Sequence, residues 1–193
     1  AGASLGAALL SYGGKVIFTP YLGENIQKTI DPKEVVDALL HKGMCGVANG
    51  PAEFGPRALG NRSLLADPRT LQMKDLVNTV KKRQKFRPFA PAILEEHCQD
   101  YFRMPADSRY MSFVYDCKRP DSIPACVHVD NTARVQTVPT WSSSILREIL
   151  ECWYERTGCP VLLNTSLNIR GMPIVNTWED AIEFSKKSSI DVF

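Results

Sequence analysis

The sequence predicts an α/β or α+β fold in which helices pack on a twisted, mixed β-sheet. Short apolar runs typical of strands alternate with longer segments whose apolar residues recur at helical spacing. Residues that commonly begin or end helices stand at the borders of those longer segments. With 193 residues, the chain is long enough to bury about 70% of the surface that its unfolded form would expose. One substantial domain is therefore expected.

Four helices are expected from periodicity and from the residues at their ends. Asp31 and Thr177 are candidate N-terminal caps, and Gly43 and Gly158 follow the last apolar residues of two helical segments. The expected helices lie between Asp31 and Gly43, over residues 70–80 and 142–156, and in a segment beginning at Thr177.

Strands are expected where short apolar or alternating runs occur. These runs cover residues 45–48, 90–94, 110–115, 125–129, 134–138 and 160–163. The Gly- and Pro-rich segment 49–62 is expected to be a loop, and the last four residues resemble a strand cut short.

Composition excludes several classes of function. The chain has 23 Lys and Arg against 21 Asp and Glu, a net charge of +2 that argues against a nucleic acid or an acidic membrane surface as partner. Its six cysteines contain no CxxC pair, which favours reduced thiols in a cytoplasmic protein. The amino terminus lacks the basic and long apolar stretches of a signal peptide or membrane anchor, and the absence of an initial Met suggests a fragment of a longer protein.

Two basic segments are candidate anion sites. In EFGPRALGNRS, Arg57 and Arg62 are separated by small residues, so guanidinium groups and backbone amides can converge on a phosphate. A plain turn with surface arginines explains that segment equally well. In the second segment, KKRQKFRPFAPAIL, Lys81, Arg83 and Arg87 share a parity that would turn them together if the run beyond Pro88 is a strand, whereas Lys82 and Lys85 suit ordinary helix capping.

Two further segments supply polar groups near expected strand ends. Arg134 begins a strand and needs an anion nearby, while His128 and Asp130 fit a structural pair better than a catalytic one. An apolar strand runs into Asn164 and Ser166, where amide and hydroxyl groups can bind phosphate, ribose or a urea-like group, although an Asn- and Ser-rich turn is the alternative. Ser166 has no evident base partner, so it is interpreted as a binding hydroxyl and not as a nucleophile.

Taken together, four segments resemble the C-terminal, YrdC-like domain of the O-carbamoyltransferases of antibiotic and nodulation-factor biosynthesis. They are EFGPRALGNRSLLADPR, the KxR…RPFAPA pattern, IPACVHVDNTARVQTV and TGCPVLLNTSLNIRGMPIV, and the similarity extends from about Tyr21 onward. The resemblance implies a YrdC-like domain over residues 26–193, with residues 1–25 as the tail of a missing N-terminal, metal-dependent domain that transfers the carbamoyl group to a substrate hydroxyl.

The resemblance also implies a reaction and a set of ligands. The domain is expected to convert carbamoyl phosphate, through carbamate, and ATP with Mg²⁺ into carbamoyl adenylate and pyrophosphate. The family's substrate-binding positions correspond to Arg57, Lys81, Arg87, Arg134, Asn164 and Ser166, with Arg62 and Arg83 as additions. Lys81, Arg87 and Ser166 are the expected catalytic groups, and no metal ligand is expected in this chain.

The sequence departs from the family pattern at two places, and two alternative functions are also considered. Residues 49–52 lack an Arg that the family often has there, and Asn131 replaces a Gly in the HVDGTAR turn. A YrdC-like module that binds double-stranded RNA is the alternative from another class, and the net charge of +2 argues against it. Threonylcarbamoyl-adenylate synthesis on the same fold ranks low, because those proteins lack the EFGPRALGNRS segment.

Overall fold

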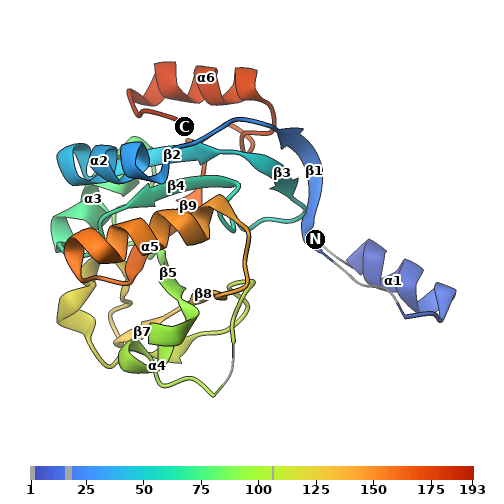
Figure 1. The fold of residues 1–193 in the computed structure, drawn as a ribbon, viewed down its shortest axis with the longest axis horizontal. Coiled ribbons are helices and arrows are strands. Elements are labelled where there is room, and N and C mark those ends of the chain that lie inside the picture. Colours follow the sequence, from blue (N-terminus) through green and yellow to red (C-terminus); the bar gives the residue numbers. More distant parts are fainter. Residues whose placement is uncertain (1–2, 16–18, 106) are drawn as a thin grey trace.

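The chain forms a five-stranded mixed sheet with helices on both faces (Figure 1). The computed structural model describes residues 3–15, 19–105 and 107–193. The strand order is β2-β4-β9-β5-β8, and every neighbouring pair is antiparallel except β5 and β8, which are parallel. The strands are β2 (Met44–Ala48), β4 (Arg62–Ala66), β5 (Ala90–Leu94), β8 (Gln136–Val138) and β9 (Val161–Ser166).

Two small antiparallel sheets lie beside the main one. The first pairs β1 (Tyr21–Ile26) with β3 (Gly50–Glu53), and the second pairs β6 (Tyr115–Asp116) with β7 (Thr132–Ala133). The last residues of the chain run parallel to β2 through a single bridge between Gly46 and Val192. The expected C-terminal strand is therefore present as a short pairing at the sheet edge.

Each face of the main sheet is covered by its own pair of helices. Helices α2 (Pro32–Lys42) and α5 (Ile145–Thr157) pack over one face, whose core includes Trp153. Helices α3 (Leu71–Val80) and α6 (Trp178–Ser188) pack over the other, whose core includes Phe184. Because successive strand residues point to opposite faces, Leu64 and Leu65 contribute to different cores.

The remaining helices are short or peripheral. Helix α4 (Cys98–Tyr101) follows a 3-10 turn, η1 (Glu95–His97), and two further turns are η2 (Pro120–Ser122) and η3 (Pro124–Cys126). Helix α1 (Ala3–Tyr12) has no buried residue and lies apart from the main body (Figure 1). None of the helices in the described ranges is both long and apolar enough to cross a membrane. All six cysteines are free thiols.

The predicted helix caps are confirmed, whereas the helix expected over 142–156 begins at Ile145, with Ser144 as its N-cap. Asp31 caps α2 by accepting from the backbone N–H of Lys33, and Gly43 ends it with φ 77°. Thr177 and Asp180 form the reciprocal capping box of α6. These signals are local, which is why the sequence alone was sufficient to place them.

Several predictions about strands and loops differ from the structure. The expected loop 49–62 contains β3, and its last residue begins β4. Residues 125 and 126 end turn η3 and residues 127–129 are irregular or in a turn, so the expected strand is absent, and the apolar character of the run reflects burial of Ala125 and Cys126 in the core. Most of segment 110–115 is irregular, because the left-handed backbone of Met111 (φ 53°) interrupts an extended run. Strand β9 continues past residue 163 to Ser166. The strand expected over 134–138 begins only at Gln136, so Arg134 lies in the connection before β8 instead of opening the strand.

Candidate functional site

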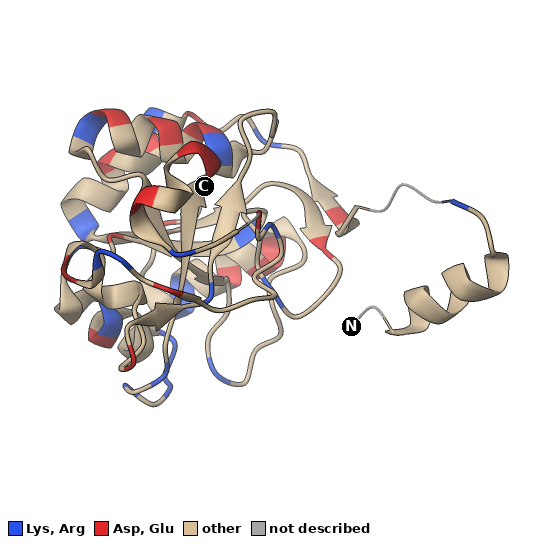
Figure 2. Cartoon of the chain, turned by 90° about the horizontal axis from the view of Figure 1, so that it is seen from below, with Lys and Arg blue, Asp and Glu red and all other residues tan. Residues whose placement is uncertain are grey.

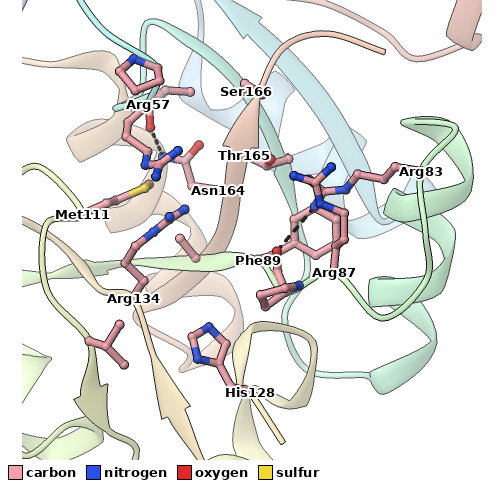
Figure 3. A pocket seen from close by; sticks show the side chains of 15 residues that line it. Arg57, Arg83, Arg87, Phe89, Met111, His128, Arg134, Asn164, Thr165 and Ser166 are labelled. Carbon is pink, nitrogen blue, oxygen red and sulfur yellow. Dashed lines mark hydrogen bonds between the residues drawn. The ribbon is translucent and has the colours of Figure 1, made fainter. Parts of the chain in front are cut away.

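A cavity of about 470 Å³ opens where β9 ends, and basic side chains dominate its polar lining. Figure 3 shows Arg57, Arg134 and Asn164 on one side of it and Arg83, Arg87 and Phe89 on the other. These residues come from four separate segments: the β3–β4 loop, the α3–β5 loop, the β7–β8 connection and the end of β9. The complete lining is Pro56, Arg57, Ala58, Arg83, Arg87, Pro88, Phe89, Ala90, Met111, Val114, His128, Arg134, Asn164, Thr165 and Ser166.

The four arginines of this cavity carry uncompensated charge. Within the described ranges, none of them has a carboxylate within 4.0 Å, and the lining contains no Asp or Glu. Burial and then the charge of Arg87 lower the pKa of Arg83 to about 10. Burial and then Arg57 lower the pKa of Arg134. An anion bound between these arginines would offset the cost of burying their charge and would reduce their mutual repulsion.

Asn78 holds the loop that presents Arg83 and Arg87. It is fully buried on α3, and its Oδ1 accepts a hydrogen bond of 2.6 Å from Nε of Arg83. Its Nδ2 donates to the carbonyls of Lys85 and Arg87, at 3.0 and 3.1 Å. The guanidinium of Arg83 also lies 4.3 Å from the ring centre of Phe89. Sequence reasoning missed Asn78, although an amide among the apolar positions of a helix is a detectable signal.

Lys81 lies behind the cavity and lines an adjoining one of about 310 Å³, which shares Arg83, Arg87 and Ser166 with the first. Only 5% of Lys81 is exposed, and its Nζ lies 2.5 Å from the Ser166 carbonyl and 3.0 Å from that of Asn168. Burial, followed by the charges of Arg83 and Arg87, lowers the pKa of Lys81 to about 7. Lys81 thus switches between charged and neutral forms near physiological pH.

The β3–β4 loop that carries Arg57 is fixed by a carboxylate. Oε1 of Glu53 accepts hydrogen bonds from the backbone N–H groups of Leu59 at 2.7 Å and Asn61 at 2.9 Å. Gly60 has φ 128°, and a Cβ there would lie 2.8 Å from Cβ of Leu146. Glu53 and Gly60 therefore shape the loop, while Arg57 itself is exposed and directed to the cavity. The role of Glu53 was not predicted from the sequence.

Arg62 does not join the other predicted site residues, and its expected place in an anion site is corrected. Its side chain is completely buried at the start of β4, where burial lowers its pKa. Its guanidinium donates to five backbone carbonyls, those of Glu24, Asn49, Gly50, Asn61 and Asn176. With its donors directed at carbonyls, Arg62 ties β1, β3 and β4 to the C-terminal part of the chain, and this role is structural.

Asn164 and Ser166 end β9 at the cavity. Asn164 is 1% exposed, and its Nδ2 donates to Oε1 of Gln136 at 2.7 Å and to the carbonyl of Ala58 at 3.2 Å. Its Oδ1 is buried without a hydrogen-bond partner in the described part of the protein. The hydroxyl of Ser166 donates to Oδ1 of Asn168 at 2.7 Å. The cavity thus combines cations with a neutral amide acceptor.

His128 lines the cavity, but its partner is a hydroxyl. Its Nδ1 lies 2.9 Å from Oγ1 of Thr132, which in turn donates to Asp130 at 2.7 Å. Burial and the charges of Arg134 and Lys74 outweigh Asp130 and lower the pKa of His128. Asn131 closes the turn with φ 60°, as expected for a residue that replaces Gly. Thr132 thus connects the predicted His128 and Asp130 pair.

The fold and the cavity define an α+β domain whose main cavity is lined by four arginines. The family described as Carbamoyltransferase C-terminus matches residues 36–193. The chain belongs to this family of enzyme domains, as the four sequence segments predicted.

Curated relatives and solved structures agree with this assignment. Nodulation protein NolO of Bradyrhizobium diazoefficiens is 40% identical over 174 residues, which cover 86% of this chain and 32% of that protein. Nodulation protein NolNO of Sinorhizobium fredii is 44% identical over 153 residues, covering 76% of this chain and 22% of that protein. The chain therefore spans about a third or less of the length of these two relatives.

Two solved structures share the fold at low sequence identity. Full-length HypF in its phosphate- and nucleotide-bound form has a TM-score of 0.62 and 19% identity, covering 86% of this chain and 25% of that one. Sua5 of P. abyssi, as its H234A/Y235A variant, has a TM-score of 0.59 and 14% identity, covering 89% of this chain and 48% of that one. The expected YrdC-like fold is confirmed.

Proposed function

We propose that this domain binds carbamoyl phosphate and ATP at the arginine-lined cavity and forms carbamoyl adenylate. The observation that carries the proposal is the convergence of Arg57, Arg83, Arg87 and Arg134 on one cavity without a carboxylate among the lining residues. Such a cavity favours a ligand with several negative charges, and guanidinium forks suit phosphate oxygens. The phosphate and nucleotide bound in the HypF structure with the same fold support this choice of ligands.

The proposed reaction has two balanced steps. Water first cleaves carbamoyl phosphate into carbamate and inorganic phosphate. A carbamate oxygen then attacks the α-phosphorus of ATP, the bond to the β-phosphate bridging oxygen breaks, and pyrophosphate leaves. The arginines stabilise the negative charge that builds on the leaving phosphates. Lys81 and the hydroxyl of Ser166, which lie 3.2 Å apart between the two cavities, are placed to contact a phosphate as it shifts.

Mg²⁺ enters this proposal on the phosphates of ATP. No group of three or more His, Cys, Asp or Glu side chains that could hold a metal occurs in the described ranges, and the cavity lining offers no carboxylate. Because Mg²⁺ prefers oxygen ligands and commonly keeps several waters with substrate phosphates, this set of residues suits a metal carried by the nucleotide.

Within the whole enzyme, the proposed partner is an N-terminal domain that carries the carbamoyl group to a substrate hydroxyl. Residues 1–25 are proposed to be the tail of that domain. Helix α1 fits this proposal because it has no buried residue, whereas residues 21–25 belong to β1 and pair with β3 of the present domain. The relatives are about three times as long as this chain or longer, which leaves room for such a domain.

Calorimetry with carbamoyl phosphate and with ATP tests the proposed function, together with pyrophosphate release when both are present. Replacing Arg87 by Ala is expected to lower affinity for carbamoyl phosphate by roughly a hundredfold, because a charged donor in a partly buried site is lost. Arg156→Ala is the matched control, since Arg156 pairs with Asp37 outside the cavity lining. Failure of the folded, unsubstituted domain to bind either substrate would refute the proposal.

A further inference from the structure

Gln136 is a buried amide that contacts the site only through Asn164. It begins β8, is 3% exposed and is not among the residues that line the cavity. Its Nε2 donates to the carbonyl of Leu59 at 2.9 Å, and its Oε1 accepts from Nδ2 of Asn164 at 2.7 Å. It therefore links the loop that carries Arg57 to the end of β9.

Two backbone carbonyls determine which way both amides point. The carbonyl of Leu59 can only accept, so Gln136 must turn its Nε2 toward it and its Oε1 toward Asn164. The carbonyl of Ala58 can likewise only accept, so it also selects Nδ2 of Asn164. Turning the Asn164 amide by 180° would place its oxygen against both Oε1 of Gln136 and the Ala58 carbonyl. Both Oε1 of Gln136 and the Ala58 carbonyl therefore exclude the opposite orientation of the Asn164 amide.

This arrangement presents an acceptor without a donor. Oδ1 of Asn164 is buried and has no partner among the described residues, although Asn164 lines the cavity. A buried amide oxygen without a hydrogen bond is costly, and such atoms are rare in folded proteins. The guanidinium groups of Arg57 and Arg134 lie on the same side of the cavity as this amide (Figure 3). The site thus offers one N–H acceptor close to two anion donors.

The family resemblance already implies that Asn164 contacts the substrate; we propose that Gln136 is the positioning residue that keeps Oδ1 of Asn164 free to accept a hydrogen bond from the NH₂ group of carbamoyl phosphate. The inference rests on the proposed function and adds an orientation for its substrate. The phosphate lies toward the arginines and the NH₂ toward β9. Carbamoyl phosphate fits because its amide and phosphate are separated by only a few bonds, whereas the amino group of adenine is far from the phosphates of ATP. The site thereby distinguishes a carbamoyl group from an acetyl group, which has CH₃ in place of NH₂.

A matched pair of stable phosphonates tests the orientation in the unsubstituted protein. Phosphonoacetamide carries the carbamoyl NH₂, and 2-oxopropylphosphonate replaces it by CH₃ at almost the same size. Calorimetry is expected to show that phosphonoacetamide binds roughly tenfold to a hundredfold more tightly, because the methyl analogue leaves Oδ1 unpaired. Equal affinities would overturn the inference while leaving the anion site intact. No binding of either phosphonate, of carbamoyl phosphate or of inorganic phosphate would instead reject the proposed function, and the inference with it.

A substitution at Gln136 tests its positioning role. Gln136→Met keeps a similar length but removes both hydrogen bonds, so the ratio of the two phosphonate affinities is expected to fall severalfold toward one. Gln72→Met, at an exposed position on α3, should leave that ratio unchanged. A folded Gln136→Met protein that retains the full ratio would refute the positioning role. If Gln136→Met does not fold, the comparison of phosphonates in the unsubstituted protein still decides the orientation of the substrate.

Discussion

Lys81 is the residue whose chemistry depends most on its surroundings. Its ordinary pKa of 10.5 falls to about 7 because it is buried and then because Arg83 and Arg87 are nearby. The free-energy cost of burying the charge of Lys81 is fully present below about pH 7 and decreases as the pH rises toward 10.5. The contribution of Lys81 therefore makes the folded state more stable with rising pH over that interval. At pH 8 we therefore expect Lys81 to be mostly neutral in the free domain.

An anion beside Lys81 is therefore expected to draw a proton from the solvent. Inorganic phosphate bound between Arg83 and Arg87 would neutralise their charges and raise the pKa of Lys81, so binding at pH 8 should take up close to one proton. Calorimetry in buffers of different ionisation enthalpy measures this uptake directly. At pH 6 the uptake should vanish because Lys81 is already charged. Lys81→Met should abolish it at pH 8, and a Met variant that still takes up the same proton would contradict the assignment.

At the residue scale, the sequence identified the chemical type of the candidate site residues more reliably than it identified the role of each one. Arg57 and Arg62 stand five positions apart in one segment, and both were expected to bind an anion. Only the pairing of β4 with its neighbours shows that Arg62 is buried against backbone carbonyls while Arg57 faces the cavity. Glu53 escaped notice because its partners are backbone N–H groups of a loop whose course the sequence does not show. Gln136 escaped notice because its partners, the Leu59 carbonyl and the Asn164 amide, lie far away along the chain.

At the scale of elements, the loop between α3 and β5 is a unit that Asn78 holds in place. Asn78→Leu removes the acceptor for Arg83 and both donors to the loop carbonyls, so affinity for carbamoyl phosphate is expected to fall roughly tenfold or more. Asn78→Asp keeps an acceptor for Arg83 and should have an intermediate effect. Calorimetry on thermally characterised variants measures both, with Gln72→Leu on the exposed side of α3 as the control. Unchanged affinity in a folded Asn78→Leu protein would show that the loop needs no such anchor.

Helices were predicted more accurately than strands for a physical reason. A helix ends through contacts within a few residues, as Gly43 and Thr177 illustrate. A strand depends on partners elsewhere in the chain: the polar residues at the end of β9 stay in the ladder because β4 pairs with them as far as Ser166. The apolar run 125–129 shows the converse, since buried turns use the same residue types as strands.

Over the whole molecule, charge is concentrated in the cavity and not spread over a face. Acidic and basic residues are mixed over the helices (Figure 2), in keeping with the net charge of +2. Double-stranded RNA needs several basic contacts spread along its backbone, whereas four arginines around one cavity suit a small anion. The distribution of charge therefore favours the small-molecule function that the four sequence segments indicated.

The two ends of the chain are expected to contribute unequally to stability. Helix α1 buries none of its residues, so removing residues 1–15 should change the free energy of unfolding by less than about 0.5 kcal/mol. Removing residues 190–193 should destabilise the fold by about 3 kcal/mol or more. Three backbone hydrogen bonds to β2 are lost, from Gly46 to Asp191, from Ala48 to Phe193 and from Phe193 to Gly46, together with the packing of Val192.

Denaturant unfolding of the two truncated proteins, measured beside the full chain, provides the comparison. Loss of stability on removing the first 15 residues would show that α1 packs on the main body in solution. A negligible change in the free energy of unfolding on removing residues 190–193 would mean that β2 needs no partner at its outer edge. The expected asymmetry follows from pairing and packing: the C-terminal residues bond to β2 at the edge of the main sheet, whereas α1 has no buried residue.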